Sequence, residues 1–420
     1  AHRLGQMFES LKNGLASRYP RETNWLTTSI DYENFRLKEF IEDSRYLDEK
    51  QYLRSLKRIG DDINALAAGR NPYHQKRGNS LRSYLSEIDG SLQPYSLSVP
   101  ANYDSSRSYP LIILLHGHGW YRPFQGHPTL TGDNVFFAAP HGRGSMDYMF
   151  VAEDDLLNVI AEIKAVYSID DDRIVLTGSS MGGTGSWSFG TKFPHLFSAI
   201  GPKAGNADRR VWQRLWGWGR VFPGPLESLP EPFDTLCRSI ADSLDPVSYA
   251  DNLINLPAFC LHGAEDRIVP VGHARAMVKR LRALNYTVTY REDPEAGHGA
   301  YKSEFYDEQW NWLFDQKRNA SPKKLRHRAW SLKHGRSYWL TIRQFLEPAR
   351  FGEVEAIIKD GKILIKTRNV RSLSIDWGLV PLKQHKPAGV ELRIDGEQVA
   401  HKGDSIFERA GNDWRPGGIT

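Results

Sequence analysis

The stretch Asp172-Arg-Ile-Val-Leu-Thr-Gly-Ser-Ser-Met-Gly-Gly183 decides the fold that this sequence predicts. A hydrophobic run ends in the pattern Gly178-x-Ser180-x-Gly182, and helix-compatible residues follow at 184–193. Such a pattern indicates a strand that turns sharply into a helix, because only very small residues fit two positions before and after the serine. The serine is then held beside a helix N-terminus, whose dipole favours negative charge. We therefore interpret Ser180 as a nucleophile.

A serine hydroxyl attacks a carbonyl only when a base removes its proton, so a histidine and an orienting acid are expected further along the chain. His298 lies in Glu295-Ala-Gly-His-Gly299, after the last predicted strand, and we predict that it is the base. Asp266 follows the predicted strand 258–261 and is the candidate acid, with Glu265 as an alternative. The order serine, acid, histidine is the one expected for this strand–turn–helix motif.

The charge that develops on the attacked carbonyl oxygen needs hydrogen-bond donors. One should be the main-chain N–H of Met181, and the other should come from a loop after an early strand. The loop Leu115-His-Gly-His-Gly119 fits, and we expect His118 to donate through its main chain, with Gly119 as the next choice. His116 and His118 also allow a metal site, but no carboxylate or third histidine stands at ligand spacing nearby. We therefore predict no metal and no cofactor.

Apolar runs alternate with helical stripes on both sides of this motif. From about residue 90 to 315 the alternation is typical of βαβ units and a parallel sheet. Residues 1–70 carry apolar residues at helical spacing, and the alternations around Asp360-Gly361 and Asp395-Gly396 are hairpin signals. Strands are predicted at 95–99, 111–115, 135–138, 174–177, 258–261 and 287–290, and helices at 155–166, 184–193 and 273–284.

The composition is ordinary for a soluble globular protein, with 40% hydrophobic and 25% charged residues among 420. No apolar run reaches the roughly 20 residues that span a bilayer. The formal net charge is +5, and basic residues concentrate at 317–336. This strip reads either as a solvated linker or as a contact for an anionic polymer or membrane surface.

Two features bear on the compartment in which the protein acts. Cys237 and Cys260 are too few for a disulfide framework, and the sequence leaves open whether they pair. The chain begins at Ala1 without a basic-then-apolar leader. The localisation stays open, and an exported protein, periplasmic or secreted with its signal already removed, fits a first residue that is not Met.

Taken together, these motifs resemble the α/β-hydrolase superfamily, closest to its prolyl-oligopeptidase-like and polyhydroxyalkanoate-depolymerase-like esterases, which include feruloyl esterases. The resemblance covers about residues 90–315 and implies a triad of Ser180, Asp266 and His298. The segments that carry it are Tyr109-Pro-Leu-Ile-Ile-Leu-Leu-His-Gly117, the motif at 172–183, Pro257-Ala-Phe-Cys-Leu-His-Gly-Ala-Glu-Asp-Arg-Ile-Val-Pro270 and Gly297-His-Gly299.

The predicted architecture is an α/β-hydrolase fold between two smaller regions. A helical region covers residues 1–88, the catalytic domain residues 89–318, and a linker with a small antiparallel β domain residues 319–420. Oligopeptidases of the superfamily carry a large β-propeller before the hydrolase domain, whereas a helical segment of roughly 90 residues stands there in this sequence. This difference favours esterase over peptidase activity.

The resemblance implies a serine carboxylesterase that works through an acyl-enzyme, on acetyl or feruloyl esters of polysaccharide. A serine peptidase of prolyl-oligopeptidase type and a non-catalytic glycan-binding protein are the alternatives. The expected partner is a small-molecule or polysaccharide ester, without nucleic acid and without a transmembrane segment. The oligomeric state stays open.

Aromatic residues of an insertion at about 205–250 are candidates for the substrate pocket, because cap segments commonly arise at this position over the serine. Trp216 and Trp218 would form its wall together with Trp120, and Arg143 and Tyr148 would stand at its rim. The competing interpretations are an aromatic cluster packed against the core and a structural role for the loop that holds Arg143 and Tyr148.

Overall fold

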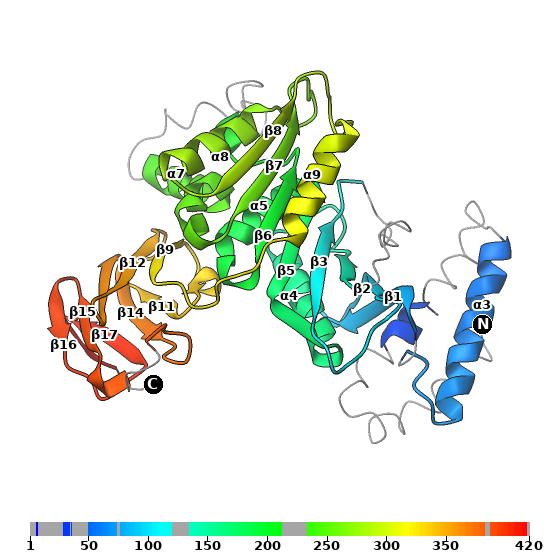
Figure 1. The fold of residues 1–420 in the computed structure, drawn as a ribbon, viewed down its shortest axis with the longest axis horizontal. Helices are drawn as coiled ribbons and strands as arrows, with labels where there is room; N and C mark the ends of the chain where they lie inside the picture. The colour runs from blue at the N-terminus through cyan, green and yellow to red at the C-terminus, as the bar shows by residue number, and fades with distance from the viewer. Residues whose placement is uncertain are drawn as a thin grey trace. The chain divides into compact units, whose positions relative to one another are not determined.

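The computed structural model divides the chain into two compact units, residues 1–170 and 171–420, and each is described by itself (Figure 1). The structure describes residues 6, 28–33, 35, 49–73, 76–119, 134–211, 233–382 and 387–417. This division falls inside the region 89–318 that the sequence predicts as one catalytic domain.

The first unit includes the helices α3 and α4 and the first four strands. α3 (Glu49–Ala67) ends shortly before Gly69, whose φ of 76° is the left-handed conformation common after a helix C-terminus. Strand order is β1-β2-β4-β3, with β3 and β4 parallel and the other pairs antiparallel. The strands are β1 (Gly78–Leu85), β2 (Leu92–Val99), β3 (Tyr109–Leu115) and β4 (Phe136–Pro140), followed by the helix α4 (Val151–Val166). β1 is absent from the predicted strands, because its sequence is largely polar.

The second unit continues with parallel strands in the order β5-β6-β7-β8. The strands are β5 (Ile169–Ser179), β6 (Ala199–Lys203), β7 (Ala258–Gly263) and β8 (Val288–Asp293); the helices are α5 (Met181–Lys192), α7 (Phe233–Leu244), α8 (Gly272–Ala283) and α9 (Ser303–Phe314), with 3-10 turns at η2 (Pro194–Leu196) and η4 (Pro246–Asn255). The neighbours Ile200 and Gly201 face opposite sides of β6, toward Gly190 of α5 and Leu313 of α9. α5 and α9 therefore cover opposite faces of these strands.

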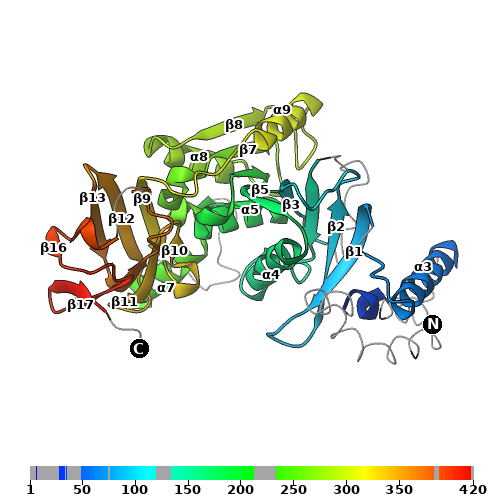
Figure 2. The same ribbon diagram turned by 60° about the horizontal axis from the view of Figure 1, so that its bottom comes forward.

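Residues 324–416 form a β-sandwich, which we call the C-terminal sandwich (Figure 2). One sheet has the order β10-β11-β14-β17-β18 and the other β16-β15-β13-β12-β9. Their inner faces share one apolar core. The first sheet comprises β10 (Arg336–Ser337), β11 (Leu340–Phe345), β14 (Val370–Ile375), β17 (Ile406–Ala410) and β18 (Asp413–Pro416); the second comprises β16 (Glu397–Val399), β15 (Glu391–Ile394), β13 (Lys362–Arg368), β12 (Gly352–Lys359) and β9 (Lys324–Ala329), and short turns lie at η5 (Leu332–His334) and η6 (Pro387–Gly389).

The sequence signals for this sandwich are confirmed in detail. β12 and β13 form the predicted hairpin, with Asp360 and Gly361 at φ 52° and 73° in its turn. Asp395 and Gly396 likewise connect β15 and β16. One pair departs from the expected antiparallel arrangement, because β13 and β15 run parallel.

The predicted linker between the hydrolase strands and the sandwich is ordered and partly a strand. Arg318 donates to Asp172 at the start of β5, at 3.0 Å. β9 begins at Lys324, inside the stretch predicted as linker. Asn252 of η4 then joins both parts, because its Nδ2 donates to the carbonyls of Thr191 and Arg328 at 2.7 and 3.0 Å and its Oδ1 accepts from the Arg328 N–H at 2.7 Å.

Two further expectations have an outcome in the structure. Cys237 and Cys260 are both free, so they do not pair. Among the described helices, none is both long and apolar enough to cross a bilayer.

Candidate active site

The sharp turn predicted at Ser180 is present in the structure. β5 ends at Ser179, α5 begins at Met181, and Ser180 between them has φ 59° and ψ −119°. A residue other than glycine adopts positive φ only at a cost in energy, and such strain clusters at functional sites. The Ser180 N–H donates to the Lys203 carbonyl at 2.9 Å, which ties the turn to the end of β6. The Ser180 hydroxyl makes no hydrogen bond to another described residue.

The first turn of α5 packs closely against the segment after β6. A Cβ atom on Gly183 would lie 2.1 Å from the carbonyl oxygen of Lys203, and one on Gly205 would lie 2.2 Å from the carbonyl carbon of Gly183. Both separations are far below van der Waals contact. The turn that carries Ser180 therefore needs glycine at both positions.

His298 follows β8, Asp266 follows β7, and their side chains meet. His298 Nδ1 lies 2.7 Å from Asp266 Oδ2. Because an ionised carboxylate only accepts hydrogen bonds, Nδ1 carries the hydrogen, and Nε2 of the neutral ring keeps a lone pair. Asp266 is buried whereas Glu265 is exposed, so the structure pairs His298 with Asp266 and not with the alternative acid.

Asp266 is held in its ionised form by the donors around it. Its Oδ1 accepts from the main-chain N–H groups of Ile268 and Val269, at 2.9 and 2.8 Å. Burial of the carboxyl opposes ionisation, but hydrogen bonds from His262, His298 and these two amides together lower the pKa of Asp266 to about 2. Asp266 is therefore a fixed negative charge beneath His298 at neutral pH.

Ser180, Asp266 and His298 leave the same edge of the parallel strands. The carboxyl ends of β5, β6, β7 and β8 are aligned through the pairs Ser179–Lys203, Lys203–Leu261 and Gly263–Asp293. Ser180 and His298 are both described in the structure, and no hydrogen bond joins Ser180 Oγ to His298 Nε2. Catalytic hydrogen bonds are often long before substrate is bound, and they tighten in its presence.

The predicted oxyanion donors lie on two segments. Met181 is the first residue of α5, so its N–H lacks an acceptor within the helix. In the first unit, Gly119 has φ 86° and donates its N–H to Ser145 Oγ at 3.0 Å. The N–H of the exposed His118 has no acceptor among the described residues. Between the two predicted loop donors, His118 is thus the one whose N–H is available.

His116 bears on the alternative of a metal site in this loop. Its Nδ1 lies 2.8 Å from the Gly117 carbonyl oxygen, and its Nε2 lies 2.8 Å from that of His141. Both ring nitrogens thus face main-chain carbonyl oxygens of the loop segments, and a neutral imidazole donates its one N–H to one of them. His116 is therefore placed as a structural residue of the loop.

Arg143 and Tyr148, predicted at the pocket rim, bond to residues of other elements of the first unit. Arg143 donates to Asp155 at 2.8 Å and to Ser86 at 2.7 Å, and it also pairs with Asp89. Tyr148 is fully buried, and its hydroxyl accepts the His116 N–H at 2.8 Å. These contacts account for both residues without a substrate, which is the structural role that the sequence left as the competing interpretation. The tryptophans predicted for the pocket wall, Trp120, Trp216 and Trp218, lie outside the described residues.

Two buried residues of this edge were not singled out from the sequence. His262 Nε2 lies 3.4 Å from Asp266 Oδ2 and 2.8 Å from the Val269 carbonyl. Lys203 donates from Nζ to Thr177 Oγ1 at 2.7 Å and to Gln309 Oε1 at 3.1 Å. The sequence signal for both is a histidine or lysine at the end of an otherwise apolar strand, because a buried polar group requires a partner.

The match to a family model covers this same region. Residues 125–318 match the model of the prolyl oligopeptidase family. The chain carries a prolyl oligopeptidase family domain. This family domain is an α/β-hydrolase, as the sequence motifs implied, and it contains Ser180, Asp266 and His298.

Two curated relatives are similar to parts of the chain. An uncharacterized secreted protein of Arthroderma benhamiae is 27% identical over 331 residues, which are 72% of this chain and 34% of the relative. Dipeptidyl aminopeptidase BIII of Pseudoxanthomonas mexicana is 23% identical over 229 residues, which are 49% of this chain and 33% of the relative. The chain thus spans about a third of the length of these relatives.

Solved structures with a similar fold include a thermostable esterase and an acylaminoacyl peptidase of Pyrococcus horikoshii. The esterase is 25% identical with a TM-score of 0.39, over 57% of this chain and 63% of its own. The peptidase is 20% identical with a TM-score of 0.42, over 54% of this chain and 39% of its own.

Proposed function

We propose that this protein is a serine hydrolase of carboxylic esters that works through an acyl-enzyme. The observation that carries the proposal is the strained Ser180 on the edge where His298 is hydrogen-bonded to the ionised Asp266 at 2.7 Å. A strained serine at the same sheet edge as a histidine whose outer nitrogen keeps a lone pair suits acyl transfer.

In the proposed mechanism, Ser180 Oγ attacks the ester carbonyl while His298 Nε2 accepts its proton. The ionised Asp266 stabilises the imidazolium that forms and holds the ring in place. The main-chain N–H of Met181 donates to the oxyanion, and His118 stays the second donor that the sequence predicts. His298 then gives the proton to the leaving alcohol, and a water activated by the same nitrogen releases the acid from Ser180. These steps use no metal or cofactor.

A serine peptidase is the second candidate, because the family domain and the dipeptidyl aminopeptidase relative both favour it. The chain spans about a third of its curated relatives, so the region before residue 89 carries no weight in the choice between ester and peptide. An alcohol is a better leaving group than an amine, and the same residues cleave an ester with less assistance. Esters are therefore the substrates proposed first.

The proposed natural substrate and the proposed export of the protein are consistent with each other. Acetyl or feruloyl esters of polysaccharide, the class implied by the sequence resemblance, are found outside cells. The Arthroderma benhamiae relative is described as secreted, which supports export of this protein. A panel of these natural esters, assayed beside simple acyl esters, tests the substrate class directly.

The decisive experiment compares an ester and an amide that share one acyl group, p-nitrophenyl acetate and p-nitroacetanilide. We expect turnover of the ester, and loss of about 10⁴-fold or more of kcat in Ser180→Ala. Ser179→Ala is the matched control and should retain activity. Faster cleavage of peptide amides than of esters would establish the peptidase instead. If a fluorophosphonate fails to label the intact protein, the result would favour the non-catalytic glycan-binding interpretation.

A further inference from the structure

The outer face of one sheet of the C-terminal sandwich is strongly basic. Side chains alternate along each strand, and the burial of β9, β12, β13 and β15 shows which residues point outward. On these four strands the outward positions hold eight lysines and arginines against three glutamates. We call this surface the cationic face: Lys324, Arg326, Arg328, Lys359, Lys362, Lys366, Arg368 and Arg393, with Glu353, Glu355 and Glu391 among them.

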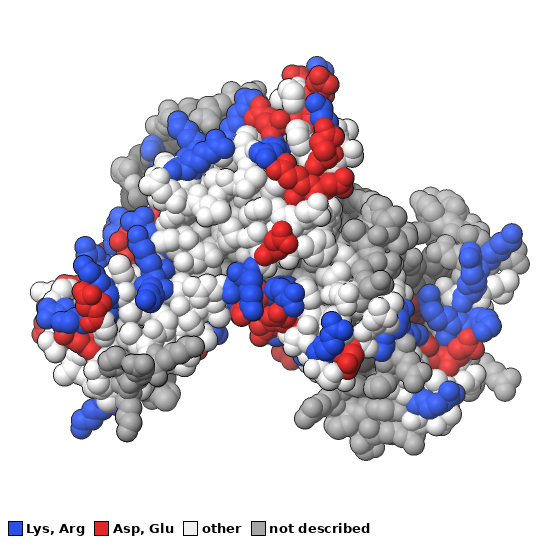
Figure 3. All heavy atoms as spheres, viewed as in Figure 1, with Lys and Arg blue, Asp and Glu red and all other residues white. Residues whose placement is uncertain are grey.

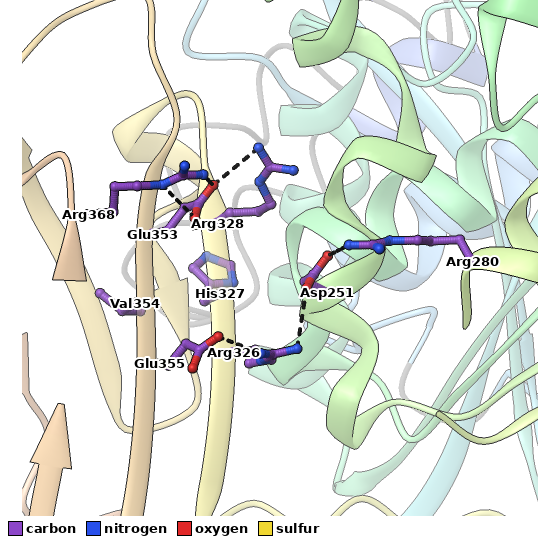
Figure 4. Close-up of a pocket in the computed structure, with 9 residues that line it drawn as sticks. All are labelled: Asp251, Arg280, Arg326, His327, Arg328, Glu353, Val354, Glu355 and Arg368. Carbon is purple, nitrogen blue, oxygen red and sulfur yellow. Dashed lines mark hydrogen bonds and ion pairs between the residues drawn. The ribbon is translucent and has the colours of Figure 1, made fainter. Parts of the chain in front are cut away.

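A polar cavity lies where the cationic face meets η4 and α8 (Figure 4). Its volume is about 170 Å³, and Arg326 and Arg328 of β9 stand opposite Asp251 and Arg280. Arg280 pairs with Asp251 at 2.6 Å, and Arg326 pairs with Glu355 at 2.6 Å. Arg326 also reaches Asp251 at 3.6 Å, so the contacts drawn in Figure 4 form one chain from Arg280 to Glu355 and a second group of Arg328 and Arg368 around Glu353.

The acidic side chains do not neutralise the bases around this cavity. Asp251 is shared by Arg280 and Arg326, and Glu353 is shared by Arg328 and Arg368. Four guanidinium groups, each with five N–H donors, therefore face three carboxylates at the cavity. An anionic group placed there would meet donors and an excess positive charge.

Three lysines extend this excess beyond the cavity. Lys324, Lys359 and Lys366 are exposed, and their side chains make no ion pair with any described residue. α8 adds the exposed Lys279 and Arg282 beside Arg280, and the helix contains no acidic residue. Blue side chains accordingly gather, with red ones between them, over the parts of the molecule that carry β9, β12 and α8 (Figure 3).

We propose that the cationic face binds an acidic polysaccharide and that one of its carboxylate-bearing sugars occupies the cavity. Arginine pairs with a carboxylate through two parallel hydrogen bonds. The glutamates between the bases accept hydrogen bonds from sugar hydroxyls, so a mixed face suits a ligand that carries both groups. The cavity has room for a single sugar ring. This site is independent of the reaction at Ser180.

A nucleic acid fits the same face less well. Duplex DNA carries one negative charge per about 1.7 Å of its axis, which demands a dense array of cations. On the cationic face, Glu353 and Glu355 lie between bases on both neighbouring strands and would oppose such a backbone. A polyuronate has one charge per sugar together with free hydroxyls, and it tolerates these glutamates.

The test is binding of the full-length Ser180→Ala variant to polygalacturonate, measured by affinity electrophoresis and by calorimetry at low salt. We expect polygalacturonate to retard this protein, dextran to leave it unaffected, and added salt to abolish the effect. Adding Lys324→Glu, Lys359→Glu and Lys366→Glu should weaken binding at least tenfold. Adding Arg280→Gln, which changes only the cavity, should weaken it by a smaller factor.

The control removes the same charge elsewhere on the sandwich, from β14 and β18 of the other sheet and from the loop before β17. Arg371→Glu, Lys402→Glu and Arg415→Glu change exposed residues, and this triple variant should bind polygalacturonate like the parent. Both triple variants, placed in the chain that retains Ser180, should hydrolyse p-nitrophenyl acetate at the parental rate, which separates this site from catalysis and shows that the fold is intact. Equal loss in both triple variants, equal binding of dextran, or tighter binding of single-stranded DNA than of polygalacturonate would each overturn the proposal.

Discussion

His262 Nε2 lies 3.4 Å from Asp266 Oδ2, the same oxygen that accepts the hydrogen bond of His298. The same nitrogen is 2.8 Å from the Val269 carbonyl, so it carries a hydrogen. His262 is fully buried, which fixes this geometry. Asp266 thus lies between two imidazoles, and we assign His262 as a residue that positions the carboxylate.

Replacing His262 should therefore slow the reaction without touching the substrate. A hydrogen bond to a charged group contributes about 1.5 kcal/mol or more, so His262→Phe is expected to lower kcat/KM for p-nitrophenyl acetate about tenfold. His262→Gln keeps an N–H donor and should recover part of the loss. An unchanged kcat/KM in a folded His262→Phe variant would refute the assignment.

The free energy of unfolding at acidic pH should depend on the ionisation of Asp266. Its pKa of about 2 in the folded protein lies below the usual value, so the ionised carboxylate stabilises the fold fully above about pH 4, and this stabilisation is lost as the pH falls through 2. In Asp266→Asn the free energy of unfolding should fall less steeply between pH 4 and 2. Urea titrations of both proteins across this range measure the difference. Identical slopes would show that Asp266 is not held ionised as described.

Lys203 should also make the protein more stable as the pH rises, but in a window at high pH. Burial lowers its pKa to about 8, below the unfolded value of about 10.4. Between these values the unfolded chain binds more protons, so the native state gains stability as the pH rises, by up to about 3 kcal/mol. Lys203→Met should lack this gain in urea titrations between pH 7.5 and 10. Lys279→Met, on the exposed surface of α8, is the control, and it should follow the parent.

Gly183→Ala should damage the turn that carries Ser180. The new methyl group would meet the Lys203 carbonyl oxygen, which also accepts the Ser180 N–H. We expect a loss of about 2 kcal/mol or more of stability together with most of the activity. A Cβ atom on Gly389 would meet nothing within 4 Å, so Gly389→Ala serves as the control. Thermal melting and ester hydrolysis on both variants test the contrast.

Asn252→Ala should loosen the C-terminal sandwich from the hydrolase strands. The change leaves the Thr191 carbonyl and the Arg328 N–H buried without their partner, at a cost of about 3 kcal/mol. Limited proteolysis should then cut between the two parts. Asn255→Ala removes a single exposed contact, to the Lys324 carbonyl at 2.8 Å, and should have little effect. Equal resistance to protease in both variants would contradict this role.

Local patterns made the hydrolase strands and the sandwich hairpins predictable. Gly178-x-Ser180-x-Gly182 between an apolar strand and a helix allows few conformations, and each Asp-Gly pair fits a two-residue turn. The spacing of Asp266 and His298 agrees with the hydrogen bond found between them. These features depend on residues close in sequence, or on the fixed order of strands in one kind of sheet.

Contacts between distant residues account for what the sequence left unseen. β9 alternates Leu325, His327 and Ala329 inward with bases outward, but the many charges made the segment resemble a linker. Arg143 resembled a substrate contact until its partners Asp89 and Asp155 were in place. His262 lies within a segment used to recognise the superfamily, yet its role depends on the loop that brings Asp266 back to it.

The bridge at Asn252 limits how this chain can be recombined. A fusion that exchanged everything after residue 318 for an unrelated module would leave the amide of Asn252 facing no strand, and the carbonyl of Pro194 without the hydroxyl of Tyr338. A replacement domain would therefore be tolerated only if it supplied the same hydrogen-bond donors and acceptors. Hydrolase strands and sandwich are thus expected to be inherited as a pair.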